Sequence, residues 1–301
     1  MGRNWKERKK GEKMTFYSPL RYPGGKGKLT KYFKELFRKN SLNEGVYVEP
    51  YVGGASIALS LLIEEYASRI IINDKDKSIY AFWYSVLNYP EELCKLIKKT
   101  PVTLEVREIQ RKIQKNKEQI KLNKKSDFLK LGFSTFFLNR TNRSGILNAG
   151  AIGGKSQKGE WKIDARYNKE GLIKRIKKIS QYKDKIELHN MDAVKLIKEL
   201  KKKWPPKTLI YLDPPYYNKG KELYMNYYLD KDHEEIAKEI NKTKKQKWVI
   251  TYDDADLIRK LYENNKKLDY PLYYSAGKPK QGKEIVIFSD NLKILNPSNV
   301  N

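Results

Sequence analysis

The stretch "VYVEPYVGGASIALSLLIEEYASRIIIND", residues 46–74, decides the fold. An apolar, β-prone run ends at Glu49, a pair of glycines follows, and an apolar helical pattern covers residues 55–66. A second apolar run then ends at Asn73 and Asp74. Strand, glycine turn, helix and strand in this order predict a parallel βαβ unit, because parallel strands must be joined by a crossover connection.

The same alternation continues on both sides of a different middle segment. Further strands are predicted at residues 186–190, 208–212 and 248–252, with a closing hairpin-like pair at 272–276 and 284–290. Helices are predicted over residues 29–38, 78–87, 169–179, 193–203, 231–242 and 256–264. The middle holds a lysine-rich helical stretch at 104–121, an apolar helix or strand at 128–138, and a loop system rich in glycine and asparagine. We therefore expect an α/β sheet domain formed by residues 14–87 and 166–301, interrupted by a basic insertion at 88–165 and preceded by a basic arm at 1–13.

The charge balance indicates a polyanionic partner. Lys and Arg total 63 against 36 Asp and Glu, a formal net charge of +27. Nucleic acid is the simplest such partner, although a lysine-rich composition can also reflect genome bias. No apolar run is long enough to cross a bilayer and no helix pattern has one basic and one apolar face, so no membrane partner is expected. The single cysteine, Cys94, cannot form an internal disulfide, which favours the reducing cytoplasm.

A second stretch, "TLIYLDPPYYNKG" at residues 208–220, points to a site. A strand that ends in Asp-Pro is explained by turn conformation alone. That explanation does not cover the second proline, Pro215, or the tyrosines Tyr216 and Tyr217. These residues place aromatic rings beside the Asp213 carboxylate at the carboxyl end of a strand, where open α/β sheets bind their ligands.

Acids follow three other predicted strands. Glu49, Asp74 and Asp192 supply the acceptors that the ribose hydroxyls and adenine amino group of a nucleoside cofactor need, although each can equally cap a helix. The glycine pair Gly53-Gly54 lacks the G-x-G-x-x-G spacing of a dinucleotide fold and the Lys-Ser/Thr of a P-loop. NAD and ATP are therefore disfavoured.

Five segments carry a resemblance to a known family: "SPLRYPGGKGKL", "VEPYVGGASIAL", "INDKD", "FFLNRTNRSGI" and "YLDPPYY". In this order they resemble the motifs of the α-group, Dam-like or D12 class, DNA adenine-N6 methyltransferases, which use S-adenosylmethionine. The resemblance spans residues 17–290. It implies a Rossmann-like methyltransferase sheet, with residues 88–165 as a mainly helical and loop-built DNA target-recognition domain.

The resemblance assigns the cofactor residues one by one. Lys26 meets the methionine carboxylate of S-adenosylmethionine, Asp74 the ribose hydroxyls, and Asp192 the adenine ring. The complete cofactor-binding set is Tyr17, Gly24, Gly25, Lys26, Glu49, Pro50, Gly53, Gly54, Asp74, Met191, Asp192 and Asp213.

The chemistry implied for the catalytic residues Asp213, Pro214, Pro215 and Tyr216 is methylation of an amino group. An adenine amino nitrogen is a poor nucleophile, because its lone pair is delocalised into the ring. The Asp213 carboxylate and the Pro214 carbonyl can accept its two N–H bonds, and Tyr216 can stack on a base flipped out of the duplex. No metal is needed. Cys94 lies in a helical context without an active-site turn, which disfavours the cysteine-dependent methylation of cytosine C5.

The resemblance implies double-stranded DNA as the partner. The candidate DNA-binding residues are Asn139, Arg140, Asn142, Arg143 and Lys155, which contact phosphates or base edges or alternatively brace their loop. Farther along, Asp253 and Asp254 either shape the target-base pocket or cap the next helix. A cognate restriction endonuclease is a further candidate partner, and the sequence leaves the oligomeric state and recognition site open. Alternative hypotheses for the function are an N4-cytosine, RNA or glutamine methyltransferase, and a nucleic-acid-binding protein without activity.

Overall fold

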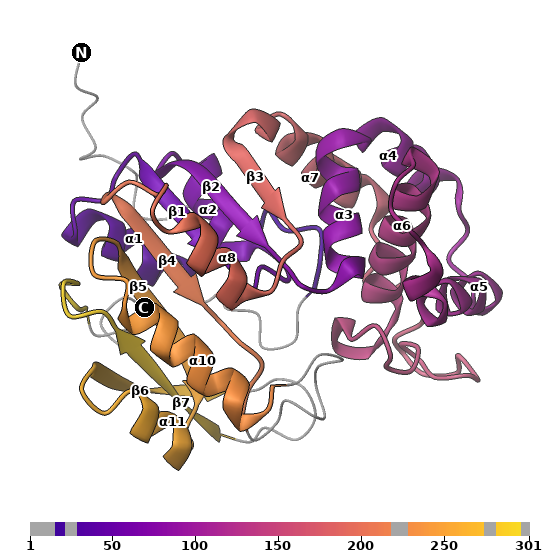
Figure 1. Ribbon diagram of the computed structural model, residues 1–301. Coiled ribbons are helices and arrows are strands. Elements are labelled where there is room, and N and C mark those ends of the chain that lie inside the picture. The colour runs from indigo at the N-terminus through magenta and orange to yellow at the C-terminus, as the bar shows by residue number, and fades with distance from the viewer. Residues whose placement is uncertain (1–15, 22–28, 218–227, 274–280, 296–301) are drawn as a thin grey trace.

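The computed structural model describes residues 16–21, 29–217, 228–273 and 281–295, with only the backbone for 270–273 and 281–283 (Figure 1). The strands are β1 (Gly45–Glu49), β2 (Ala67–Asn73), β3 (Ile186–His189), β4 (Thr208–Leu212), β5 (Lys247–Asp253), β6 (Lys266–Tyr273) and β7 (Gln281–Phe288). The helices are α1 (Thr30–Lys39), α2 (Ser56–Ile63), α3 (Lys77–Asn88), α4 (Pro90–Lys99), α5 (Leu104–Lys115), α6 (Lys125–Thr141), α7 (Lys169–Ser180), α8 (Ala193–Leu200), α10 (Asp230–Asn241) and α11 (Asp256–Leu261). Short 3-10 helices are η2 (Lys117–Gln119), η3 (Arg143–Gly145) and η4 (Lys183–Lys185).

The described strands form one sheet in the order β3-β2-β1-β4-β5-β7-β6. The neighbouring strands β3, β2, β1, β4 and β5 pair in parallel, and β7 is antiparallel to both β5 and β6. The βαβ unit and the Rossmann-like α/β fold are thereby confirmed. The closing antiparallel pair is present, but its first strand, β6, begins at Lys266 rather than at residue 272. From β1 the chain builds outward to β3 and then returns to place β4 on the other side of β1. In open α/β sheets, ligands bind at the carboxyl edge beside such a reversal.

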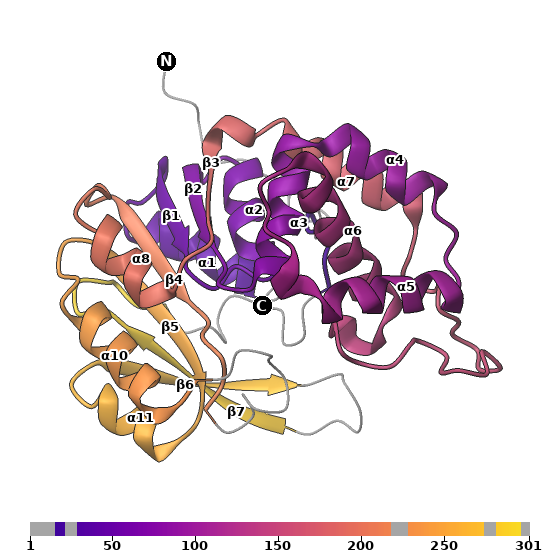
Figure 2. The same cartoon turned by 45° about the vertical axis from the view of Figure 1, so that its right-hand side comes forward.

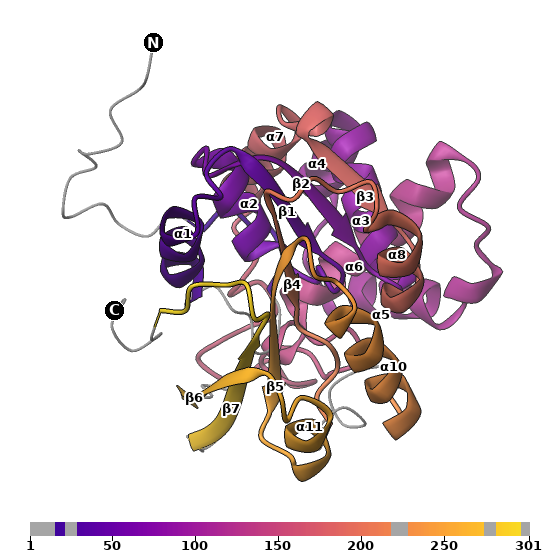
Figure 3. The same ribbon diagram turned by 60° about the vertical axis from the view of Figure 1, so that its left-hand side comes forward.

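Helices cover both faces of the sheet, as Figure 3 shows with α1 and α2 on one side and α8 and α10 on the other. Alternate side chains of each strand face opposite layers. Tyr47 and Tyr211 lie in the cluster with α1, α2 and α3, whereas Val48 and Leu212 lie in the cluster with α8, α10 and α11. The central strands are therefore buried on both sides, and every residue of β1 and β4 is buried.

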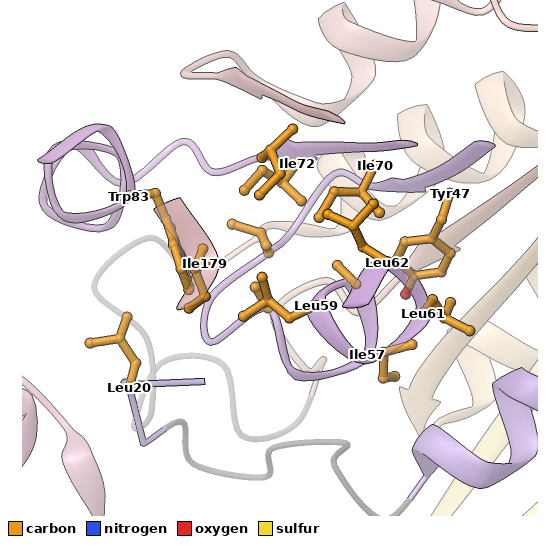
Figure 4. Packing of buried hydrophobic residues seen from close by; sticks show 14 of the residues in the cluster. Leu20, Tyr47, Ile57, Leu59, Leu61, Leu62, Ile70, Ile72, Trp83 and Ile179 are labelled. Atoms are coloured by element: carbon orange, nitrogen blue, oxygen red, sulfur yellow. The ribbon is translucent and has the colours of Figure 1, made fainter. Parts of the chain in front are cut away.

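The core of the first βαβ unit is built by α2, which is buried almost all round. Leu62 of this helix lies close to Ile70 of β2 (Figure 4), and Ile57, Leu59 and Ile72 belong to the same apolar cluster. The helix ends at Ile63, before the predicted end at residue 66, since Glu65 takes a positive φ of 63° and turns the chain into β2.

The insertion is helical and is continuous with the main core. In Figure 2, α4, α5 and α6 form a group beside the sheet, with α3 and α7 between them and the strands. Ile97 of α4 and Phe136 of α6 belong to the same apolar cluster as Tyr47 of β1. The apolar stretch 128–138 is a helix, α6, which is buried on most of its surface and so has no amphipathic period. The sequence left α4 unassigned, although Pro90 at its first turn and acids after it are ordinary helix-start signals.

Several helices are shorter than the apolar pattern predicts. The stretch 104–121 divides into α5 and η2, α8 ends at Leu200 rather than residue 203, and α11 ends at Leu261 rather than residue 264. Periodicity locates a helix better than it locates the last turn, where capping decides. Within the described ranges, none of the helices has the combination of length and apolarity that crossing a bilayer requires.

Candidate active site

Acidic side chains gather at the carboxyl edge of the parallel strands. Glu49 ends β1, Asp74 follows β2, Asp213 follows β4, and Asp253 ends β5. The order of these strands places them together, and Glu49 lies close enough to Asp213 and Asp74 for both carboxylates to raise its pKa. The sheet therefore brings together residues that are far apart in the sequence, as the strand-end pattern predicts.

Asp213 is held from the neighbouring strand. The Thr251 hydroxyl of β5 donates to Oδ1 of Asp213 at 2.7 Å. The same hydroxyl lies 3.0 Å from the Tyr211 hydroxyl of β4, and both Thr251 and Tyr211 are buried. Because Thr251 donates to the carboxylate, Tyr211 donates to Thr251, and this chain of hydroxyls orients Asp213. Thr251 was not among the predicted site residues; its signal is its place in "WVITY", the strand that pairs with β4.

The residues after Asp213 are fixed on both sides. The Tyr216 hydroxyl donates to the carboxylate of Glu284 in β7, and both side chains are buried. The backbone N–H of Tyr217 donates to Oδ1 of Asp253 at 2.8 Å. Asp253 thus holds the backbone directly after the tetrapeptide, whereas Asp254 forms an ion pair with Arg259. A role of either acid in the target-base pocket stays a prediction.

Glu49 is a buried carboxyl at the centre of this edge. It is 5% exposed, and its Oε2 has no hydrogen-bond partner among the described residues. Burial raises its pKa well above the ordinary value, and the nearby charge of Asp213 raises it further. A buried polar atom without a partner is costly in a folded chain, which makes this atom a candidate for contact with a ligand.

Asp74 joins two loops of the site. Its Oδ2 accepts from the backbone N–H of Gly53 at 3.0 Å and its Oδ1 from that of Asp76 at 2.9 Å. Burial, followed by the charge of Asp76, raises the pKa of Asp74 to about 7. Gly53 has a positive φ of 43°, which a residue with a side chain rarely adopts. The carboxylate of Asp74 therefore ties the glycine turn after β1 to the loop after β2.

Asn73 joins the loops after β1 and β3, although it was not among the predicted site residues. Its side-chain amide donates to the carbonyls of Pro50, at 2.9 Å, and Met191, at 3.0 Å. Its Oδ1 accepts from the Met191 N–H at 2.9 Å. Asp192 caps α8 by accepting from the N–H groups of Val194 and Lys195. This cap is the structural alternative for Asp192, and its contact with the cofactor stays a prediction.

The candidate DNA-binding residues fall into two groups. Asn139, Arg140 and Asn142 are buried and hydrogen-bond mainly to backbone groups. Their partners are Arg21 and Gly145 for Asn139, Pro19 for Arg140, and Ile146, Leu147 and the Arg107 side chain for Asn142. These hydrogen bonds brace the loop, and their partners are mainly backbone groups and not acidic side chains. Arg143 and Lys155 are exposed. DNA contact by any of the five stays a prediction.

Tyr17 is half-buried and packs against the main core, whereas Gly24, Gly25 and Lys26 lie outside the described residues. Cys94 is a buried side chain of α4, and burial raises the pKa of its thiol to about 11. In the described part of the chain, no three His, Cys, Asp or Glu side chains are grouped so that they could hold a metal ion.

The solved structures to which this chain is similar are distant from it. An rRNA methyltransferase, aviRa, from Streptomyces viridochromogenes has 12% identity and a TM-score of 0.39, with 94% of this chain and 93% of that chain covered. A SAM-dependent methyltransferase from Agrobacterium tumefaciens has 9% identity and a TM-score of 0.38, with 87% and 62% covered. Comparison with curated proteins found no match.

The family comparison covers most of the chain. The family model described as D12 class N6 adenine-specific DNA methyltransferase matches residues 22–274. The match contains the glycine turn, the acids at the strand ends and the Asp213-Pro214-Pro215-Tyr216 tetrapeptide. This chain belongs to the D12 class N6 adenine-specific DNA methyltransferase family.

Proposed function

We propose that this methyltransferase moves the methyl group of S-adenosylmethionine to the N6 amino group of an adenine that has been flipped out of duplex DNA. Family membership supports the transfer and its adenine specificity. The observation that carries the proposal is the carboxylate of Asp213, at the end of β4 and oriented by Thr251 at 2.7 Å. It is followed directly by two prolines and the anchored Tyr216.

Asp213 and Pro214 act on the amino group of the target. The carboxylate accepts one N–H bond and the Pro214 carbonyl the other, so that the nitrogen lone pair turns towards the methyl donor. A proline offers only an acceptor to the amine, because it has no N–H of its own. Thr251 and Glu284, which hold the two ends of the tetrapeptide, keep these acceptors in place before the base arrives.

The acceptors at the strand ends fit the donors of the cofactor. Bound S-adenosylmethionine supplies an activated methyl group on a positively charged sulfur. It also carries an ammonium, two ribose hydroxyls and an adenine amino group as donors. We assign the unpartnered Oε2 of Glu49 to the methionine side, Asp74 to the ribose and Asp192 to the adenine ring. Gly53 and Gly54 leave room for close approach of the backbone, and Lys26 is proposed to meet the carboxylate.

The DNA side of the proposal rests on charge and on the aromatic ring. A chain with net charge +27 attracts the phosphate backbone, and exposed Arg143 and Lys155 are the proposed contacts of the recognition segment. Extracting a base costs roughly a few kcal/mol, and stacking on an aromatic ring restores about 1–3 kcal/mol per base. Tyr216 is 3% exposed. In this proposal, its covering residues therefore move when the base enters.

The test is to identify the modified nucleoside. Wild type is incubated with S-adenosylmethionine and unmethylated DNA of mixed sequence, and the digest is analysed by mass spectrometry. We expect N6-methyladenine from wild type, none from Asp213→Ala, and a wild-type yield from Asp290→Ala. Asp290 is a matched control because its carboxylate is exposed and lies 3.8 Å from its partner Lys244. N4-methylcytosine, or modification of RNA or protein instead of DNA, would refute the proposed substrate, and activity in Asp213→Ala would refute the proposed site.

A further inference from the structure

An arginine cluster lies where the segment before residue 22 meets α6 and α7. Arg140 is in the last turn of α6, Arg175 is in α7, and Arg166 and Arg21 complete the group. Arg140 and Arg175 donate to the carbonyls of two consecutive residues, Pro19 and Ser18, so these two side chains meet at one segment of the chain. The charges of Arg21 and Arg166 also act on Arg140. No carboxylate of the described residues forms an ion pair with any of the four, whereas elsewhere Arg259 pairs with two acids.

Arg140 is the buried centre of this cluster and uses few of its donors. It is 8% exposed, and its Nε donates to the Pro19 carbonyl at 2.7 Å. A guanidinium has five N–H donors, and within the described part of the chain the two Nη atoms of Arg140 have no hydrogen-bond acceptor. Arg175 donates to the Ser18 carbonyl at 2.9 Å. Neutral carbonyls hold these side chains in position without neutralising their charge.

The buried hydroxyl of Tyr167 is a second, independent observation at the arginine cluster. Its ring is 5% exposed and packs against Phe136 and Phe137, with centroids 5.4 Å apart in each case. Its hydroxyl is buried and has no hydrogen-bond partner among the described residues. Phe136 and Phe137 precede Arg140 by one turn of α6, so the ring of Tyr167 packs beside the position of Arg140, whose charge acts on the hydroxyl. An unused hydroxyl beside an unpaired buried cation is a combination that folded chains rarely keep.

The electrostatic state of the cluster is unfavourable as it stands. Burial, followed by the charges of Arg175 and Arg21, lowers the pKa of Arg140 to about 9. Burying a charge is costly unless it is paired, and like charges add to that cost. An anion between these groups would remove both penalties and would accept the unused N–H and O–H donors.

We propose that Arg140, Arg175 and Tyr167, with Arg21 and Arg166 beside them, form a binding site for a phosphate group. Arginine forks match the oxygens of a phosphate in a bidentate manner, and a tyrosine hydroxyl can supply a further donor. We assign the phosphate to the DNA backbone, a step that rests on the proposed function. The exposed Arg143 follows Arg140 by three residues, so the cluster continues into the segment proposed to contact DNA.

The first experiment tests the site without DNA. Thermal unfolding is followed in inorganic phosphate and in chloride at equal ionic strength. We expect phosphate to raise the Tm of wild type above its value in chloride, and Lys174→Gln to keep this difference. Lys174 is the matched control, since it is exposed on the same helix and carries the same charge. Arg175→Gln should lose most of the difference. Equal Tm values in the two salts, or the same loss in Lys174→Gln, would overturn the site.

Tyr167→Phe separates binding from folding. It removes only the unpartnered hydroxyl, so the variant should be as stable as wild type in chloride and should gain less from phosphate. A variant that gains as much as wild type would show that this hydroxyl does not contact the anion. Because no hydrogen bond of the described chain is lost, a folding defect cannot produce the expected result.

The second experiment identifies the source of the phosphate. The affinity for a short duplex is measured over a range of salt concentrations. For Arg175→Gln we expect the slope of log affinity against log salt to fall by about 0.9, the value for one phosphate contact, while Lys174→Gln changes it less. If phosphate stabilises wild type but the slope is unchanged, the site takes a free anion and the DNA assignment is wrong. If phosphate stabilises wild type but no DNA is methylated, the site stands and the proposed function fails.

Discussion

Replacing Thr251 by valine tests whether the hydroxyl chain orients the catalytic carboxylate. Valine has nearly the same shape as threonine, so the buried position remains filled. It cannot donate to Oδ1 of Asp213, which now accepts from Thr251 at 2.7 Å, and it cannot accept from Tyr211 at 3.0 Å. The substitution therefore removes two hydrogen bonds and leaves the sheet pairing between β4 and β5 unchanged.

The size of the effect follows from the burial of these groups. A hydrogen bond to a charged group contributes about 1.5–3 kcal/mol. If all of it acts in the transition state, kcat/KM falls by roughly 10- to 150-fold, because about 1.4 kcal/mol corresponds to a factor of ten. Tyr211 is 1% exposed, and its unpaired hydroxyl costs about 1–3 kcal/mol of folding stability in addition.

The assay is methyl incorporation into DNA, with binding and stability measured on the same preparations. We expect Thr251→Val to lower kcat/KM as stated while the Kd for DNA stays within about a factor of two, a change below about 0.5 kcal/mol. Thr251→Ser keeps the hydroxyl and should lose at most a few-fold. Tyr211→Phe removes only the outer bond, so its loss of activity should be smaller than that of Thr251→Val. A folded Thr251→Val enzyme with full activity would refute the orientation of Asp213 by this hydroxyl.

Three further predictions concern pH, DNA contact and capping. The raised pKa of Glu49 means that rising pH ionises this residue in the unfolded chain before the folded one, so its contribution to stability declines above its ordinary pKa of 4.5. Glu49→Gln should therefore gain stability relative to wild type between pH 5 and pH 8 in urea unfolding, and a constant difference would contradict this. Arg143→Gln and Lys155→Gln should each reduce the salt dependence of DNA binding by about one unit, and unchanged slopes would remove them from the interface. Asp192→Ala should destabilise the protein by about 1 kcal/mol because α8 loses its cap, whereas Asp192→Asn should remain close to wild type.

Most of the fold was predictable because its signals are local. Apolar runs bounded by turn residues marked the strands, and the helices with one apolar face, such as α1, were found from their period. The region 128–138 was ambiguous for a physical reason. The surface of α6 is buried against α3, α4 and α5, so its sequence lacks the polar face by which a helix is recognised. The order of the strands in the sheet followed from the rules of parallel connection only in part, since the placement of β7 between β5 and β6 has no local signal.

The candidate site was predictable where chemistry is concentrated at strand ends. Asp74 and Asp213 could be selected because each directly follows a predicted strand, and because Asp213 is followed by a second proline and two tyrosines that turn conformation does not explain. The groups that hold them could not be selected in this way. Thr251, Asn73 and Glu284 are ordinary strand residues in the sequence, and only the sheet register brings them to the site.

The buried polar residues of the insertion mark the limit of reasoning from residue type. Asparagine and arginine in a glycine-rich segment are typical of exposed loops, and by that rule Asn139 and Arg140 should face solvent. They are buried because the segment around residues 18–21 lies against them, and both side chains donate to its backbone carbonyls. Bracing and binding are then compatible in one side chain. The Nε of Arg140 donates the hydrogen bond that braces the segment. This bond to a neutral carbonyl leaves the positive charge of the guanidinium in place, and that charge makes the cluster around Arg140 a site for an anion.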